Sequence, residues 1–187
     1  DHIWYLIYYH FDDSNDIPSD LKFSVTQKLN GDTKEEWQNC RRVKGGYDFV
    51  PPFAGMGNDP MDDAGHGTHV AGTALGNGVL KGVAPDAELY AYKVCSYEGS
   101  CPEWSILAGI ERSLDPNEDG NTEDHVDIIS MSLGGPGYAD DVLSRAIDSA
   151  TDAGITTVVS AGYSGGSSLF ITMGSPAAAE KAITVGA

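Results

Sequence analysis

The feature that most limits the fold is an alternation of short apolar runs with amphipathic stretches, from about residue 60 onward. The apolar runs lie at 87–94, 126–132, 155–161 and 182–185, and the helical patterns at 65–75, 102–114 and 138–153. Such alternation is typical of βαβ units, and strands that are apolar throughout are typical of a parallel sheet covered on both faces. We therefore expect an α/β fold with a mostly parallel sheet flanked by helices. In such sheets the functional residues follow the carboxyl ends of the strands.

Residues 12–62 differ from this pattern, because they are polar, rich in Asp, Gly and Pro, and only weakly periodic. We expect surface loops there with one short strand at Gly46–Val50, preceded by a strand-like run at Ile3–Tyr9. No internal repeat and no low-complexity linker divides the 187 residues, so a single domain is expected.

Composition excludes two classes of partner. The net charge is −17, so no basic surface is available to neutralise the phosphates of a nucleic acid. The longest apolar run, Ile3–Tyr9, is too short to cross a bilayer and lacks the features of a signal peptide, so no membrane partner is expected.

The three cysteines leave two interpretations open. Cys95 and Cys101 flank a Gly-Ser turn, which suits a small disulfide loop in an oxidising compartment. Alternatively, all three are reduced thiols, and Cys40 has no evident partner in either case.

The most specific motif is Gly65–Gly72, with the sequence GHGTHVAG, at the start of the first predicted helix. It resembles the catalytic-histidine motif of the subtilases, the family of subtilisin-like serine proteases. The resemblance implies that His66 is the general base, a role that suits an imidazole because it titrates near neutral pH. His69 is expected to be structural. A metal site on the two histidines is a weaker interpretation, since no cysteine or glutamate ligands accompany them.

Other segments resemble the same family in the same order along the chain. Gly82–Pro85 and Lys181–Ala187 match family segments, and Ser132, Leu133 and Gly134 match the stretch that lines the substrate cleft. The resemblance implies that this stretch binds an extended polypeptide substrate by strand-like hydrogen bonds. The similarity covers about residues 45–187, so that residues 1–187 are expected to be a partial subtilase catalytic domain with a three-layer subtilisin-like fold.

The family's catalytic aspartate has no clear counterpart. Subtilases place it at a strand end, in a string such as Asp-Ser-Gly, and Asp13-Ser14-Asn15 is the nearest match here. Asn tolerates positive φ better than most other residues, which supports Asp13. Asp12 is nearly as good a match, and a solvated acidic turn is an equal alternative. In the triad the aspartate fixes the histidine tautomer and stabilises the imidazolium.

Two further departures concern the oxyanion hole and the nucleophile. The family has Ala-Gly-Asn-Ser-Gly where this chain has Ala161-Gly162-Tyr163-Ser164-Gly165, so Tyr163 replaces the asparagine whose amide stabilises the oxyanion. The family's Gly-Thr-Ser-Met-Ala string, which carries the nucleophilic serine, does not occur in these residues. A missing C-terminal segment, a second chain or an inactive homologue would each account for this.

One motif resembles that of an unrelated class of serine hydrolases. Gly162–Gly166 fits the Gly-x-Ser-x-Gly nucleophile elbow of the α/β-hydrolases, with Ser164 at its centre. In those enzymes the catalytic histidine follows the serine, and no histidine follows His125. This interpretation is therefore rejected.

The acidic stretch 115–124 predicts a calcium loop. Oxygen ligands recur there at alternate positions with a glycine at the sixth, as in EF-hand-type loops. The expected ligands are Asp115, Asn117, Asp119, Asn121 and Asp124. The twelfth position is Val126, so either Asp124 or Asp127 would close the shell. The alternative is a solvated acidic turn.

Two functions of different classes follow from the resemblance. The first is a secreted serine endopeptidase that acts by a Ser-His-Asp mechanism, with a polypeptide substrate. The second is a catalytically inactive homologue that binds peptides or calcium, which the changed aspartate and oxyanion regions favour.

Overall fold

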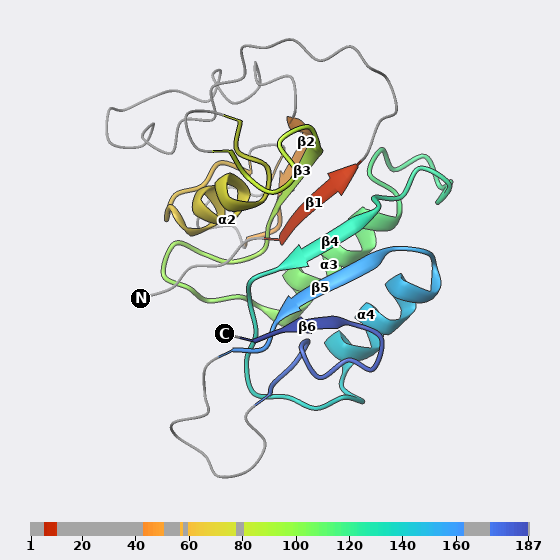
Figure 1. Cartoon of the computed structure of the whole chain (residues 1–187). Coiled ribbons are helices and arrows are strands. Elements are labelled where there is room, and N and C mark those ends of the chain that lie inside the picture. The colour runs from red at the N-terminus through yellow and green to blue at the C-terminus, as the bar shows by residue number, and fades with distance from the viewer. Residues whose placement is uncertain are drawn as a thin grey trace.

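The computed structural model describes residues 6–10, 43–50, 57, 60–77, 81–162 and 173–186, with only the backbone of 6–10. These residues form one six-stranded sheet with the order β2-β3-β1-β4-β5-β6 (Figure 1). The strands are β1 (Leu6–His10), β2 (Val43–Asp48), β3 (Glu88–Lys93), β4 (Ile128–Met131), β5 (Thr156–Ser160) and β6 (Ile183–Val185). The helices are α2 (His66–Leu75), α3 (Glu103–Leu114) and α4 (Val142–Asp152).

The prediction of a mostly parallel sheet is confirmed, with one strand as the exception. The β2–β3, β4–β5 and β5–β6 pairs are parallel. Strand β1 runs antiparallel to both of its neighbours, with Leu6 opposite Tyr92 on β3 and opposite Met131 on β4. The carboxyl end of β1, at His10, therefore lies beside Glu88 at the amino end of β3.

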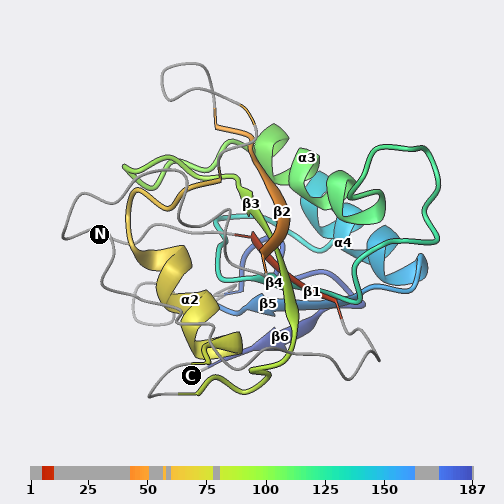
Figure 2. The same ribbon diagram turned by 90° about the horizontal axis from the view of Figure 1, so that it is seen from above.

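Helices cover both faces of the sheet, which confirms the three layers. Figure 2 shows α2 on one side of the sheet and α3 with α4 on the other. Side chains that alternate along a strand point to opposite faces. Accordingly Leu89 of β3 packs in the cluster under α2, and Tyr92 of the same strand packs in the cluster under α3 and α4.

The core under α3 and α4 is the larger of the two. Its buried side chains come from β3, β4, β5 and both helices, and include Tyr92, Ile129, Met131, Val159, Ile110 and Ile147. The cluster under α2 has smaller side chains at its centre, namely Ala71, Leu75, Ala87 and Leu89. Each fully buried aliphatic side chain contributes about 1.5–3 kcal/mol of transfer free energy, so the α3–α4 side carries most of the hydrophobic stabilisation.

Helix α4 begins later than its sequence pattern predicts. The pattern starts near Tyr138, whereas the helix starts at Val142 because Asp141 caps it. The Ser144 N–H donates to Asp141 Oδ1 at 2.9 Å, which satisfies one of the free N–H groups of the first turn. The Tyr138 N–H donates to the other oxygen of the same carboxylate, so Tyr138 lies in the turn before the helix.

Cys95 and Cys101 form a disulfide, which resolves the open question on these two thiols. The bond closes a short loop after β3, in which the Ser96 N–H donates to the Ser100 carbonyl at 2.8 Å. Cys40 lies outside the described residues. Within the described part of the chain, no helix combines the length and apolar character that crossing a membrane requires.

Candidate active site

The candidate site lies at one edge of the sheet. Strands β2, β3 and β4 end there at Asp48, Lys93 and Met131. His66 follows a turn that contacts the end of β3 through the Asp63–Lys93 pair, and the stretch Ser132–Gly134 follows β4 directly. Since one strand separates β3 from β4, their ends are about 10 Å apart at the usual strand spacing. The two predicted site elements are therefore at the same edge, two strands apart.

His66 is the first residue of α2, and its side chain is half-buried. The preceding Gly65 has φ of 89°, a left-handed conformation in which a side chain would be strained. A Cβ at Gly65 would meet nothing within 4 Å, so the backbone conformation alone requires glycine there. His69 is exposed, and the structural role expected for it stays a prediction.

Asp62 organises the turn before His66. Its Oδ1 accepts the N–H groups of Ala64 at 2.8 Å and Gly65 at 2.7 Å. Its Oδ2 accepts the Thr68 N–H at 2.8 Å and the Thr68 hydroxyl at 2.6 Å. Burial would raise the pKa of Asp62, but these hydrogen bonds from Thr68, Ala64 and Gly65 outweigh it and lower the pKa below its usual value.

Asp63 anchors the same turn to the sheet. Its Oδ2 lies 2.6 Å from Nζ of Lys93, the last residue of β3. Lys93 is only 4% exposed, and its Nζ also lies 3.6 Å from Oδ2 of Asp48, which is 3% exposed. Burial raises the pKa of Asp48, against the lowering effect of the Val50 N–H and of Lys93. One buried ammonium thus joins β2, β3 and the turn before α2.

Two neighbouring segments support the stretch Ser132–Gly134: the end of β5 and the segment around Ser175. Leu133 is buried, and the hydroxyl of Ser160 at the end of β5 donates to its carbonyl at 3.5 Å. Gly134 is exposed, and a Cβ there would lie 3.3 Å from the Ser175 carbonyl oxygen. The next residue, Gly135, exchanges two backbone hydrogen bonds of 3.0 Å with Ser175. The structure thus places the stretch as a supported, partly exposed extension of β4.

The side chain of Ser175 connects this extension to the cap of α4. Its hydroxyl donates to Asp141 Oδ1 at 2.7 Å and lies 3.2 Å from the Ser144 hydroxyl. Burial would raise the pKa of Asp141, but the hydrogen bonds from Ser144, Ser175 and Tyr138 lower it overall. The same carboxylate therefore caps α4 and fixes the segment around Ser175, which forms an isolated bridge with Gly135.

Two predicted catalytic positions, Asp13 and Tyr163, lie outside the described residues, as does the alternative Asp12. The nearest described neighbour of Tyr163 is Gly162, which follows β5 with φ of 77°. For the aspartate, the described strand is β1, whose carboxyl end points away from the edge that holds His66. The roles of Asp13 and Tyr163 stay predictions.

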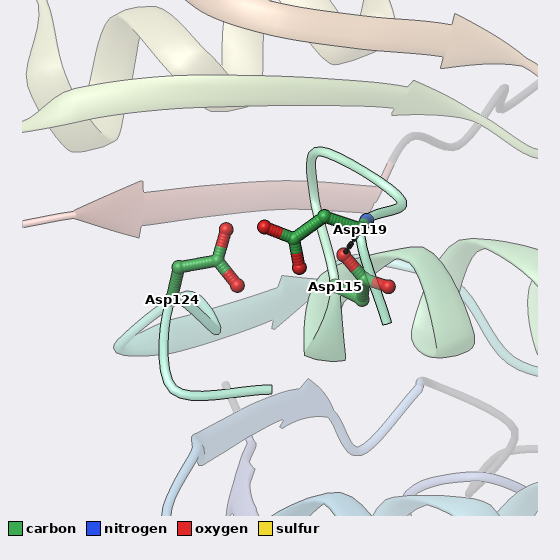
Figure 3. A group of neighbouring side chains, drawn as sticks. All are labelled: Asp115, Asp119 and Asp124. Atoms are coloured by element: carbon green, nitrogen blue, oxygen red, sulfur yellow. Dashed lines mark hydrogen bonds between the residues drawn. The ribbon is translucent and has the colours of Figure 1, made fainter. Parts of the chain in front are cut away.

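The acidic loop brings together three of its five predicted ligands. Carboxylate oxygens of Asp115, Asp119 and Asp124 all lie within 4.8 Å of one another. Figure 3 shows the carboxylates of Asp119 and Asp124 facing each other, while Asp115 Oδ1 accepts the Asp119 N–H at 3.1 Å. The side-chain oxygens of Asn117 and Asn121 accept backbone N–H groups at 2.9 and 3.1 Å. Of the two candidates for closing the shell, Asp124 is the one in this group.

Three residues that support the site are not among those predicted from the sequence: Asp62, Asp48 and Lys93. A signal for Asp62 was present, because a carboxylate shortly before a helix often accepts its free N–H groups. A lysine at the end of an apolar strand was a weaker signal for a buried ion pair. The pairing of Lys93 with Asp48 and Asp63 depends on contacts across the sheet that the sequence does not show.

Comparisons with known proteins agree with this architecture. The sequence model of the subtilase family matches residues 30–187. The serine protease AprX of Bacillus subtilis (strain 168) is 43% identical over 148 residues, which cover 72% of this chain and 33% of AprX. Subtilisin DY of Bacillus licheniformis is 44% identical over 150 residues, which cover 78% of this chain and 50% of that protein.

Among solved structures, sphericase superposes with a TM-score of 0.64 and 37% sequence identity, over 76% of this chain and 46% of sphericase. The chain thus spans half or less of the length of each of these three relatives. The family match covers the described helices from α2 onward and the strands from β2 onward, including His66 and Ser132–Gly134. By sequence and by fold, this chain belongs to the subtilase family.

Proposed function

We propose that the protein is a serine endopeptidase that hydrolyses peptide bonds by acyl transfer, with His66 as the general base. The observation that carries the proposal is the placement of His66. In a chain of this family, it stands at the first residue of α2, half-buried, at the edge where β2, β3 and β4 end. Such an edge is where α/β folds position their reacting groups.

The proposed reaction divides the work among few groups. His66 takes the proton of a serine hydroxyl as this attacks the substrate carbonyl, and later returns the proton to the leaving amine. Ser132, Leu133 and Gly134 hold the substrate backbone by strand-like hydrogen bonds, which fits an extension of β4 whose Gly134 is exposed. Asp13 is the candidate from the family resemblance for the residue that orients the imidazole; this assignment rests on the sequence alone, because β1 ends at the opposite edge of the sheet from His66. The nucleophilic serine would be supplied by a segment or chain outside these 187 residues.

A fluorophosphonate probe tests this proposal, because it labels only a serine that a base has activated. The complete gene product should be labelled, and His66→Ala should reduce labelling at least a thousandfold. His69→Ala is the matched control, since this exposed histidine lies on the same helix, and it should be labelled like the wild type. Equal labelling of the His66→Ala protein and the wild type would refute the assignment of the base.

A second candidate function is peptide binding without hydrolysis, and Tyr163 favours it. In a subtilisin, loss of the oxyanion donor that this position supplies costs about 2.7–4 kcal/mol of transition-state stabilisation. If the protein is a slow peptidase, Tyr163→Asn should raise kcat at least tenfold. Tight binding of peptides with no turnover in either protein would favour the binding function instead.

We further propose that the protein is secreted. The Cys95–Cys101 disulfide supports this, because such bonds persist in oxidising compartments. One of its relatives is named as the minor extracellular protease Vpr of Bacillus subtilis (strain 168), at 41% identity over 148 residues. Finding the protein in the culture medium would agree with the proposal, and finding it only inside the cells would contradict it.

Calcium binding by the acidic loop is a separate proposal. Three carboxylates within 4.8 Å of one another are a suitable donor set for a hard cation, with Asp115 half-buried and the other two exposed. Asp115, Asp119 and Asp124 would hold the ion, with Asn117 and Asn121 as further oxygen donors, and the ion would neutralise their charge. The expected effect of the ion is on the stability of the loop. The loop precedes the amino end of β4, whereas His66 lies at the edge where β4 ends.

Titration calorimetry with calcium alone tests the loop. The wild type should bind one ion, and Asp119→Ala should weaken binding at least tenfold because it removes the central carboxylate. Asp140→Ala is the control, as it removes an exposed aspartate that lies outside the loop. Identical heats for the wild type and the Asp119→Ala protein would end the proposal.

A further inference from the structure

The carboxylate of Asp62 accepts hydrogen bonds from the backbone on both sides of His66. Two of its N–H donors, Ala64 and Gly65, precede the histidine, and the third, Thr68, follows it by two residues. The Thr68 hydroxyl adds a fourth hydrogen bond, at 2.6 Å. A single side chain therefore holds the chain on both sides of His66 in one position.

These hydrogen bonds fix the backbone conformation of the residue that carries the imidazole. The Thr68 N–H belongs to the first turn of α2, where no intrahelical carbonyl is available as acceptor. The Ala64 and Gly65 N–H groups fix the turn in which Gly65 takes its positive φ of 89°. Together they set the backbone direction at His66, and the direction of the Cα–Cβ bond follows from it.

The neighbouring Asp63 has a different task. It pairs with Lys93 at the end of β3, and so sets where the turn lies relative to the sheet. Asp62 accepts four hydrogen bonds from residues 64–68, and so sets how His66 is oriented at the end of that turn. Asp63 thus sets the location of the histidine, and Asp62 sets its orientation.

We propose that Asp62 is a positioning residue, which aims the His66 imidazole at the serine through the turn that it closes. The inference rests on the proposed peptidase function, and it adds a residue that works on the base without touching substrate. A displacement of a reacting group by about 1 Å can reduce a rate by about a hundredfold. Loss of the four hydrogen bonds should therefore appear mainly in the rate of the chemical step.

Four variants of the complete gene product separate positioning from general stability. Asp62→Ala removes the whole carboxylate, whereas Asp62→Asn keeps one acceptor oxygen. Thr68→Val removes one hydroxyl donor to Asp62. Thr73→Val is the matched control, because it removes a hydroxyl that donates to the His69 carbonyl at 3.0 Å in the last turn of the same helix.

The main readout is the rate constant of fluorophosphonate labelling, measured below the melting temperature of each variant. Asp62→Ala should lose about a hundredfold, Asp62→Asn should recover part of that loss, and Thr68→Val should lose more than Thr73→Val. With a peptide substrate, kcat should fall while KM changes less than threefold. The His66 ring resonance in the NMR spectrum should shift in Asp62→Ala and Thr68→Val, and stay in place in Thr73→Val.

The proposal is overturned if folded Asp62→Ala reacts at the wild-type rate, or if Thr73→Val loses as much as Thr68→Val. If Asp62→Ala does not fold, the labelling rates of Thr68→Val and Thr73→Val test the proposal in its place, and equal losses overturn it. A wild-type protein that takes no label would refute the peptidase function alone. The His66 resonance then decides, since an unchanged resonance in Thr68→Val and Asp62→Asn would overturn the positioning role.

Discussion

The turn before α2 and the loop after α3 are both rich in aspartate, but they balance their negative charge in different ways. In the turn, backbone N–H groups satisfy Asp62 and a buried ammonium pairs with Asp63 and Asp48. In the loop, Asp115 and Asp119 also accept backbone N–H groups, at 2.8–3.1 Å, but their carboxylates and that of Asp124 lie within 4.8 Å of one another. One basic side chain, Arg112, also reaches this loop, where it pairs with Glu118.

This difference separates two uses of the same residue type. Where the protein provides its own cation and donors, aspartates lock a backbone in place and can support a reacting group. Where several carboxylates lie close together without such a cation between them, they are a suitable donor set for a hard cation from solution. The number of aspartates in a segment is therefore less informative than what lies opposite their oxygens.

The largest expected effect comes from removing the internal cation of the turn. Lys93→Met leaves the carboxylates of Asp48 and Asp63 near each other without the buried ammonium. Breaking a buried pair in this way typically costs about 3–5 kcal/mol of unfolding free energy. Urea denaturation of the variant and the wild type measures the difference.

Lys44→Met is the control for that experiment. Lys44 pairs with Glu88 at the surface, with 39% of its side chain exposed, and such pairs contribute about 0–1 kcal/mol. Similar losses for the two lysine variants would show that the buried ammonium has no special role, and the contrast between the two aspartate-rich segments would fail.

A smaller effect is expected from adding calcium, which we propose binds the loop. Calcium at about 100 times its dissociation constant should stabilise the fold by about 2.7 kcal/mol, which corresponds to a rise in Tm of about 5–10 °C. Asp119→Ala should abolish the rise, whereas Asp62→Asn should retain it in full. A rise that is lost in both variants would mean that the two segments do not act separately.

The smallest effect concerns acid. Because folding lowers the pKa of Asp62, its stabilisation is complete above the unfolded value of 3.8 and is lost as the pH falls through the folded value. Asp62→Asn, which costs about 1 kcal/mol or less at pH 7, should therefore lose less stability than the wild type between pH 4 and pH 2. Urea midpoints at pH 7, 4 and 2 test this, with Asp140→Asn as control. Parallel curves for wild type and Asp62→Asn would contradict it.

The order of elements and the position of His66 could be predicted because they depend on local patterns. Alternating apolar runs and amphipathic stretches locate α2 to α4 and β3 to β6 within a few residues. The start of α4 was predicted too early because Asp141 was not recognised as its cap, a role that also depends on Ser175, 34 residues away. Calcium ligands were predicted from spacing alone, and three of the five converge.

Sequence by itself determined the family, the layered α/β architecture and the candidate for the general base, because these depend on apolar periodicity and on a motif of adjacent residues. Only the tertiary structure decided what supports that base. The pairing of Lys93 with Asp48 and Asp63, and the antiparallel direction of β1, arise from contacts between segments far apart along the chain. Burial makes such contacts strong because the low dielectric of the interior penalises any unpaired charge, and burial is a property of the folded chain.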